Sequence, residues 1–326
     1  MARNALISEK RLQTIESRQL ELRWGSEYRP AMLATRDEAP TKSRPSTMYS
    51  KKLGRDLHFM SQPERHVCLL GLYNPNVFDI HEQHMLHTLE APHPLAGRGD
   101  TKLMALRPFK GTIDVAERLN ILSKHPVIWL KTDEGDSVRL PFPYLGDLLL
   151  FLNDDRGPYC VNWSVKPTHE SFIDRKVPPT RTAVTGAFHT NGQPLALRHH
   201  LEKLYFSDAE ITTHFVASES LDTQVISNLQ TLYLRAQRPT ALSSIVRERV
   251  ISRVQKIIDT PETLLSLLPS LTKELQCSRE GCLTAFYQAI WFRQLRIDLH
   301  RPILPDKPLN PERSDVLLDY SYLFVR

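Results

Sequence analysis

The chain has 326 residues and a formal net charge of +5, with 24% charged and 41% hydrophobic residues, proportions ordinary for a soluble globular protein. It is long enough for two domains, and its mild basic excess is compatible with a nucleic-acid partner. No run of about 18 apolar residues is present, which excludes a membrane-spanning helix. The N-terminus lacks the apolar segment of a secretory signal, so we expect a cytoplasmic protein.

The four cysteines also favour a reducing compartment. Cys68 and Cys160 lie in apolar runs and are expected to be buried thiols. Cys277 and Cys282 are five positions apart and have no second pair of ligands nearby, so their spacing argues against a zinc site.

Residues 1–56 are expected to form an N-terminal helix followed by a basic arm. A loose apolar stripe predicts a helix over 1–24, and residues 26–56 are polar, loop-like and interrupted by prolines. Basic side chains outnumber acidic ones in this arm, and Lys52 and Arg55 are candidate contacts to DNA phosphates. The alternative is a solvated arm that packs on the core, and the charge pattern does not choose between the two.

Residues 57–235 are predicted to form an α/β domain in which strands are flanked by helices. Ser61 can cap a helix over 61–73, with Glu64 three residues after the cap. Residues 88–126 are irregular, with a short helix at 113–123, and indicate an insertion. The other expected elements are strands at 77–80, 146–152, 160–166 and 211–217, a hairpin of 127–131 with 138–141, a loop at 167–194, and helices at 195–206 and near 225–233.

After a linker at 235–239, residues 240–326 are expected to form a second domain. Three helices followed by the alternating stretch 295–299 suggest a helical, winged-helix-like module. Its first helix carries Arg247, Arg249 and Arg253, which are candidate contacts to DNA or to a partner protein. A solvated polar face explains the same charges equally well.

Three side chains of the α/β domain have the types that a metal-dependent DNA-cutting site needs. Glu64 lies at the start of a helix, Asp147 at the start of a buried strand, and Lys166 at the end of the next strand. Charges at buried strand ends are costly unless something pairs them, and a divalent cation would do so. Mg²⁺, with Mn²⁺ as the alternative ion, takes oxygen ligands, so we predict that Glu64 and Asp147 bind it together with the Ser164 hydroxyl and the Val165 carbonyl. Lys166 would orient the attacking water or stabilise developing negative charge.

Each of the three residues also has an ordinary structural explanation: a capping-box acid for Glu64, a turn residue for Asp147 and a solvated strand end for Lys166. Three histidines at spacings of three, within 81–87, would suit a metal site on a helix. The preceding run 77–80 has the pattern of a strand, in which a step of three alternates faces, and this argues against a metal site there.

A series of sequence blocks sets these residues in a wider pattern. The blocks are Tyr49-Ser50-x-Lys52-x-Gly54-Arg55, His58, Ser61-x-x-Glu64, Val77-x-Asp79-Ile80-x-Glu82-Gln83, Asp147, Val165-Lys166-Pro167 and Leu201-Glu202, followed by 211–234. In this order they resemble the TnsA family, the endonuclease subunits of heteromeric bacterial transposases. The resemblance covers about 45–235, apart from a long stretch at 88–140.

The resemblance implies a restriction-endonuclease-like α/β core followed by a winged-helix-like C-terminal domain. It implies an Mg²⁺-dependent endodeoxyribonuclease that cleaves the 5′, non-transferred strands at transposon ends during bacterial cut-and-paste transposition. The implied partners are transposon-end DNA, an RNase-H-like transposase subunit that cuts and joins the 3′ ends, and an ATPase regulator that contacts the C-terminal region. The family roles fall here on Glu64 and Asp147 as metal ligands and on Lys166 as the catalytic lysine.

Two other functions stay open, and one departure from the family pattern favours the first of them. The position two before the lysine, often Gln or Glu in such nucleases, is Ser164, whose short hydroxyl is a weaker ligand. This favours a catalytically impaired scaffold that binds DNA and partners in the same complex. A free-standing restriction or repair nuclease would use the same three residues.

Overall fold

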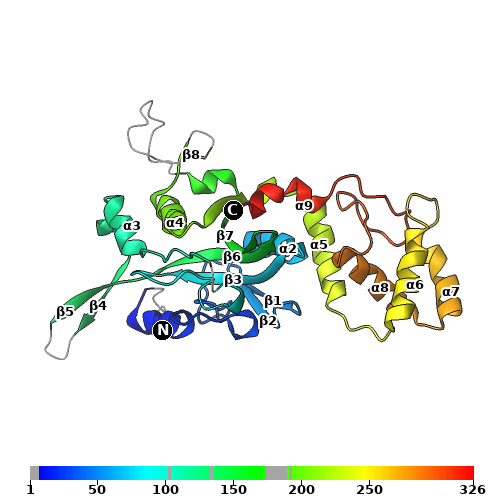
Figure 1. Ribbon diagram of the computed structural model, residues 1–326, viewed down its shortest axis with the longest axis horizontal. Helices are drawn as coiled ribbons and strands as arrows, with labels where there is room; N and C mark the ends of the chain where they lie inside the picture. The colour runs from blue at the N-terminus through cyan, green and yellow to red at the C-terminus, as the bar shows by residue number, and fades with distance from the viewer. Residues whose placement is uncertain (1–6, 102–103, 132–135, 174–188, 191–192) are drawn as a thin grey trace. The chain divides into compact units, whose positions relative to one another are not determined.

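The computed structural model describes the chain except for residues 1–6, 102–103, 132–135, 174–188 and 191–192. The described residues form a mixed α/β structure that divides into two compact units (Figure 1). The first unit comprises Met1–Cys68, Asn76–Ser220 and Leu323–Arg326, and the second comprises Leu69–Pro75 and Leu221–Tyr322. None of the described helices is long and apolar enough to cross a membrane.

The first unit is built on a four-stranded mixed sheet. Its strands follow the order β10-β7-β6-β3, where β3 is Val77–Leu86, β6 is Tyr144–Asp154, β7 is Gly157–Lys166 and β10 is Thr212–Ala217. β3, β6 and β7 pair antiparallel, and β10 runs parallel to β7. β6 and β7 are mostly buried, which explains their near-continuous apolar sequence. The four strands expected for this core are therefore confirmed, and β3 extends six residues beyond its expected end at residue 80.

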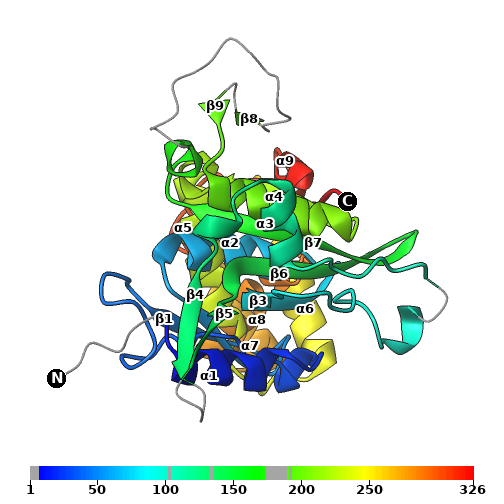
Figure 2. The same cartoon turned by 90° about the vertical axis from the view of Figure 1, so that its left-hand side faces the viewer.

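Helices cover this sheet. In Figures 1 and 2, α4 lies above the strands and α1 below them. α4 contributes Leu201 and Tyr205 to a hydrophobic cluster that includes Leu149 and Phe151 of β6. The helices of this unit are α1 (Glu9–Gln19), the first half of α2 (Gln62–Tyr73), α3 (Thr112–Arg118) and α4 (Leu197–Asp208).

Two strands form in the segment that was expected to be a loop-like arm. β1 (Ser46–Ser50) pairs antiparallel with β2 (Arg55–Phe59), and the side chains of Arg55, Leu57 and Phe59 are buried. The prediction of an irregular arm is wrong here. The charged residues of this segment suggested a loop, but in β2 every second side chain points inward and contacts the core. This part of the arm packs on the core.

The remaining short elements lie around the sheet. The expected hairpin is confirmed as β4 (Val127–Lys131) with β5 (Ser137–Pro141), and Ile128 packs in a cluster with Leu12 and Ile15 of α1. The insertion at 88–126 contains α3 and the isolated bridge between Ala91 and Phe109. The other elements are β8 (His189–Thr190), β9 (Gln193–Pro194) and the 3₁₀ helices η1 (Gly25–Glu27), η2 (Gly99–Thr101), η3 (Leu122–Lys124), η4 (His169–Phe172), η5 (Ser218–Ser220) and η6 (Ser321–Phe324).

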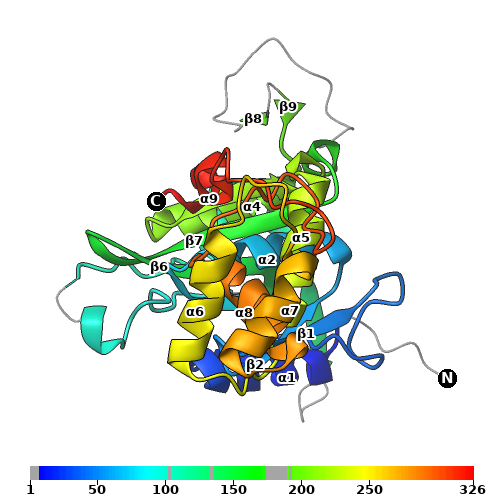
Figure 3. The ribbon, with the colours of Figure 1, turned by 90° about the vertical axis from the view of Figure 1, so that its right-hand side faces the viewer.

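The second unit is helical in its described residues, as Figure 3 shows from the side of α6 and α7. Its helices are α5 (Thr223–Ala236), α6 (Ser244–Gln255), α7 (Leu264–Leu275), α8 (Arg279–Trp291) and α9 (Val316–Asp319). α8 is the central helix, since α5, α6 and α7 all pack against it and most of its side chains are buried. α5 was expected at the end of the nuclease domain, but its packing on α8 groups it with the C-terminal unit.

The strand expected at 295–299 is not formed. In this part of the chain an isolated bridge joins Ile297 to Pro311, and no ladder extends from it. The residue that faces Ile297 is Pro311, and proline has no N–H to donate to a ladder. The helical character of this domain is thus confirmed, and its likeness to a winged helix stays a prediction.

The last four residues belong to the first unit and hold β7 from one side. The carbonyl of Leu323 accepts the indole N–H of Trp163 at 2.7 Å, and the carbonyl of Phe324 accepts the hydroxyl of Tyr159 at 2.9 Å. Arg326 forms an ion pair with Asp154 at the opposite end of β6 from Asp147. β7 is therefore fixed along its length by groups distant in sequence.

Candidate active site

The ladder between β6 and β7 ends at the residues of the candidate site. It runs from Asp154 and Gly157 to Leu148 and Trp163, so the next pair along the strands would be Asp147 and Ser164. At this point the Asp147 carboxylate accepts the backbone N–H of Val165, with 2.7 Å between N and Oδ2. A side chain thus takes the place of a backbone rung where the regular pairing stops.

Lys166 lies beside Asp147 at the same strand end. Its Nζ is 3.3 Å from Asp147 Oδ2 and donates a hydrogen bond of 2.9 Å to the carbonyl of Val165. The side chains of Asp147 and Lys166 are 16% and 30% exposed, so solvent and a substrate can reach the pair from one side. Asp147 Oδ1 accepts no hydrogen bond from the described residues, which leaves an oxygen available to a ligand.

Glu64 joins this pair from the first turn of α2. Its Oε1 accepts the hydroxyl of Ser61 at 2.6 Å, and its Oε2 accepts the backbone N–H of Met60 at 2.9 Å. Burial raises the pKa of Glu64 to about 7, and the negative charge of Asp147 adds to the rise. Lys166 and Asp147 are thus in direct contact, and Glu64 lies near enough for the charge of Asp147 to raise its pKa.

Gln83 is a site residue to which the sequence analysis gave no role, although it ends the block Val77-x-Asp79-Ile80-x-Glu82-Gln83. It lies between the pairs Glu82–Leu148 and His84–Gly146, which sets it opposite Asp147, and its φ of 48° departs from strand geometry. Its side-chain amide donates to Glu64 Oε2 at 2.9 Å. A second sequence signal was the run of polar residues 81–84 inside a strand that is buried almost throughout.

The donors at this strand end fit a hard divalent cation. Glu64, Asp147 and the Val165 carbonyl supply oxygen atoms, and Mg²⁺ is usually held by one or two carboxylates together with waters and substrate phosphates. Across the described ranges, no group of three or more His, Cys, Asp or Glu side chains is arranged to hold a metal ion.

The Ser164 hydroxyl has its partners on the side of α4. It donates to Glu202 Oε2 at 3.1 Å and lies 3.4 Å from His199 Nδ1. Burial works to raise the pKa of Glu202, but hydrogen bonds and charge from His199, Arg198 and Asn162 outweigh it and lower the pKa to about 2. The role of Ser164 as a metal ligand stays a prediction, and none of these contacts supports it.

The two candidate DNA contacts of the N-terminal arm have different surroundings. Lys52 is exposed in the turn between β1 and β2, where a phosphate could reach it. Arg55 is 6% exposed, and its Nη1 donates to both carboxylate oxygens of Glu82, at 2.8 and 2.9 Å. The prediction that Arg55 contacts DNA is corrected, because Glu82 and the carbonyl of Ile80 occupy the guanidinium.

The three arginines of α6 also differ. Arg249 is exposed and Arg247 is half-buried, and neither forms an ion pair with another described residue. Arg253 is half-buried and lies 3.5 Å from Glu274 of α7. Arg249 is therefore the most accessible of the three to a phosphate.

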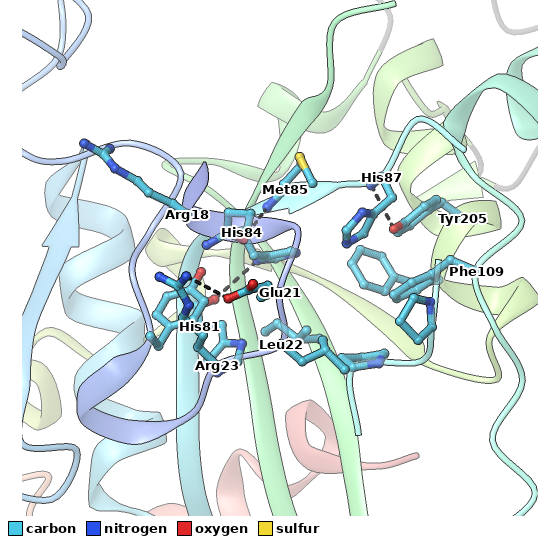
Figure 4. A pocket seen from close by; sticks show the side chains of 16 residues that line it. Arg18, Glu21, Leu22, Arg23, His81, His84, Met85, His87, Phe109 and Tyr205 are labelled. Atoms are coloured by element: carbon cyan, nitrogen blue, oxygen red, sulfur yellow. Dashed lines mark hydrogen bonds and ion pairs between the residues drawn. The ribbon is translucent and has the colours of Figure 1, made fainter. Parts of the chain in front are cut away.

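The three histidines of 81–87 line a separate cavity of about 50 Å³, together with residues of α1, Phe109 and Tyr205 (Figure 4). Burial lowers the pKa of His84 and His87 to about 4, so both rings are uncharged at neutral pH. His81 stacks on Tyr28 at a ring distance of 3.8 Å, and the amide of His87 donates to the Tyr205 hydroxyl. His81 and His84 thus pack as aromatic groups beside this cavity.

Comparisons with known proteins give no family for the chain. No protein-family model matches its sequence, and no curated protein is similar to it.

Proposed function

We propose that the chain is a metal-dependent endodeoxyribonuclease with a restriction-endonuclease-like core. In this proposal it is the TnsA-like subunit that cleaves the 5′, non-transferred strands at transposon ends. The observation that carries the proposal is the meeting of Glu64, Asp147 and Lys166 where the ladder of β6 and β7 ends. A buried Glu64 whose pKa is raised beside the partly exposed ion pair of Asp147 and Lys166 is the kind of perturbed group that favours a role in chemistry.

The chemistry assigned to each group follows from its neighbours. Glu64, Asp147 and the Val165 carbonyl would hold Mg²⁺ or Mn²⁺, which supplies charge neutralisation at the scissile phosphate and acidifies water. The Val165 N–H keeps the Asp147 carboxylate in place, and Gln83 does the same for Glu64. Lys166 orients the attacking water or stabilises negative charge on the phosphate.

The proposed partners come from the family resemblance and from charge. The net charge of +5 and the exposed Lys52 and Arg249 favour DNA as the substrate. An RNase-H-like transposase subunit and an ATPase regulator of transposition complete the proposed complex, which acts in the bacterial cytoplasm.

The test is nicking of a supercoiled plasmid in Mg²⁺ or Mn²⁺, by the full chain alone and with the neighbouring transposase subunit. Asp147→Ala should reduce nicking to background while thermal unfolding remains cooperative. Asp155→Ala is the control, because Asp155 has the same charge and is exposed in the turn after β6. An Asp147→Ala variant that still cuts would show that the site is assigned wrongly.

A second candidate is a scaffold without cleavage activity, and the contacts of Ser164 favour it. The hydroxyl that would complete the ligand set is bonded to Glu202. Calorimetric titration with Mg²⁺ and Mn²⁺ separates the two proposals, since a scaffold should have no metal site of millimolar or tighter affinity that Asp147→Ala removes. A free-standing restriction or repair nuclease would bind metal in the same way, but its gene should have no adjacent transposase gene.

A further inference from the structure

A buried polar cluster lies between β7 and α4, next to the proposed cleavage site. Glu202 of α4 is 2% exposed and accepts two hydrogen bonds from β7, one from the Ser164 hydroxyl and one from the Asn162 amide at 3.0 Å. His199, one turn earlier on α4, lies 3.6 Å from the same carboxylate. The proposed cleavage chemistry does not use any of these side chains.

A carboxylate at this depth is not needed to attach α4 to the sheet. The neighbouring inward residues Leu201, Tyr205 and Phe206 already bury apolar surface in the cluster that includes Leu149. Replacing buried charges by apolar groups is often neutral or stabilising, so packing alone does not account for Glu202.

The end of β7 is paired along one edge only. Beyond Trp163 the ladder with β6 has ended, while β10 continues to pair with Ser164, Val165 and Lys166 on the other edge. On the side of β6, the hydrogen bond from the Val165 N–H to Asp147 replaces the ladder. Ser164 immediately precedes Val165, so a contact that fixes Ser164 also fixes the direction of this N–H.

We propose that Glu202 is a positioning residue of the cleavage site: by accepting the Ser164 hydroxyl, it holds the end of β7 so that the Val165 N–H and the Lys166 amine face Asp147. The inference rests on the proposed function. Both groups that Glu202 meets on β7 are donors, and a carboxylate has two accepting oxygens for them. A glutamine can accept with one oxygen only, and its amide nitrogen would face a donor, so Gln is not an equivalent residue here.

The first test is amide hydrogen exchange in the metal-free full chain. In Glu202→Gln and in Ser164→Ala we expect exchange in the segment 161–166 to become about tenfold faster, as for the loss of one hydrogen bond to a charged group. Tyr205→Phe is the matched control, because it removes a buried hydrogen bond of α4 to His87 and leaves Ser164 untouched. Exchange at 161–166 that stays at the wild-type rate in both variants would overturn the proposal. Ser164→Ala removes only a hydroxyl, so the test survives if Glu202→Gln does not fold.

The second test is the affinity for Mn²⁺, measured by calorimetry with the same variants. Glu202→Gln should bind Mn²⁺ about tenfold more weakly than the wild type, the usual cost of losing a group that orients a ligand. Tyr205→Phe should bind as the wild type does. An unchanged affinity in Glu202→Gln would refute the positioning role, whereas a wild-type chain without any Mn²⁺ site would refute the nuclease proposal itself. In that second case the exchange rates still decide whether Glu202 holds the strand.

Discussion

Replacing Arg55 by methionine should destabilise the first unit strongly, because Arg55 neutralises a carboxylate that water cannot reach. Glu82 is 0% exposed, and both of its oxygens accept the same guanidinium nitrogen, at 2.8 and 2.9 Å. Removing one partner of a buried pair costs about 3–5 kcal/mol, since the other charge stays behind without compensation. Methionine keeps most of the volume of the side chain, so the loss reports on charge more than on packing.

The pH dependence of this loss follows from the remaining carboxyl group. Burial raises the pKa of Glu82 to about 7 even with Arg55 present, and without the guanidinium the folded-state pKa should rise further. A carboxyl group whose pKa is higher in the folded than in the unfolded state stabilises the fold below its unfolded pKa. That contribution is lost as the pH rises through the folded pKa. Arg55→Met should therefore lose less stability at pH 5 than at pH 8.

Urea unfolding at these two pH values measures both effects. The double variant Arg55→Met/Glu82→Gln should recover most of the loss, because no buried charge remains. Lys42→Met is the control: Lys42 is exposed in the arm before β1, and its substitution should change the free energy of unfolding by less than about 0.5 kcal/mol. The reasoning is refuted if Arg55→Met unfolds at the wild-type urea concentration and instead weakens DNA binding, as the sequence alone predicted.

Two further predictions concern the second unit. Arg293 and Arg296 bind Asp315 at 2.7 and 2.8 Å and, although burial opposes them, lower its pKa to about 2 from 3.8. Because the folded-state pKa is the lower one, about 2 kcal/mol of stability is present above pH 4 and is lost as the pH falls toward 2. The stability of Asp315→Asn, measured by thermal unfolding between pH 4 and pH 2, should not show that loss. A pH dependence of stability parallel to that of the wild type would contradict the assignment. Arg249→Glu combined with Arg247→Glu should reduce the dependence of log K on log salt for DNA binding by at least about one, and an unchanged slope removes α6 from the DNA-contact surface.

The parts of the fold that could be predicted from the sequence are those with local causes. Ser61 and Glu64 do form the hydrogen bonds of a helix start, and the apolar run after Asp147 is a central strand. Lys166 closes the next strand, as its pattern indicated. Since two antiparallel strands joined by a short turn bring their far ends together, Asp147 and Lys166 had to lie close in space.

The parts that were missed depend on contacts between residues far apart in the chain. Arg55 and Glu82 look like surface charges in the sequence, and only their pairing across β2 and β3 allows both to be buried. Similarly, Pro311 faces Ile297 from a segment that no local pattern connects to 295–299. Two local patterns therefore gave wrong predictions: the charged residues of a short strand predicted a loop, and the alternating stretch 295–299 predicted a strand although it faces a distant proline.

Ser164 shows where local sequence patterns stop predicting the site and contacts between distant residues decide it. Regular alternation sets Ser164 and Lys166 on one face of β7, and the sequence therefore predicted that both serve the metal site. In the structure Lys166 contacts Asp147, whereas Ser164 contacts Glu202, although only Val165 separates them. The divergence occurs where the ladder with β6 has ended and side chains take over the hydrogen bonds of the backbone. Because β6 no longer pairs with this end of β7, two carboxylates accept from its adjacent residues: Glu202 of α4 accepts the Ser164 hydroxyl, and Asp147 of β6 accepts the Val165 N–H.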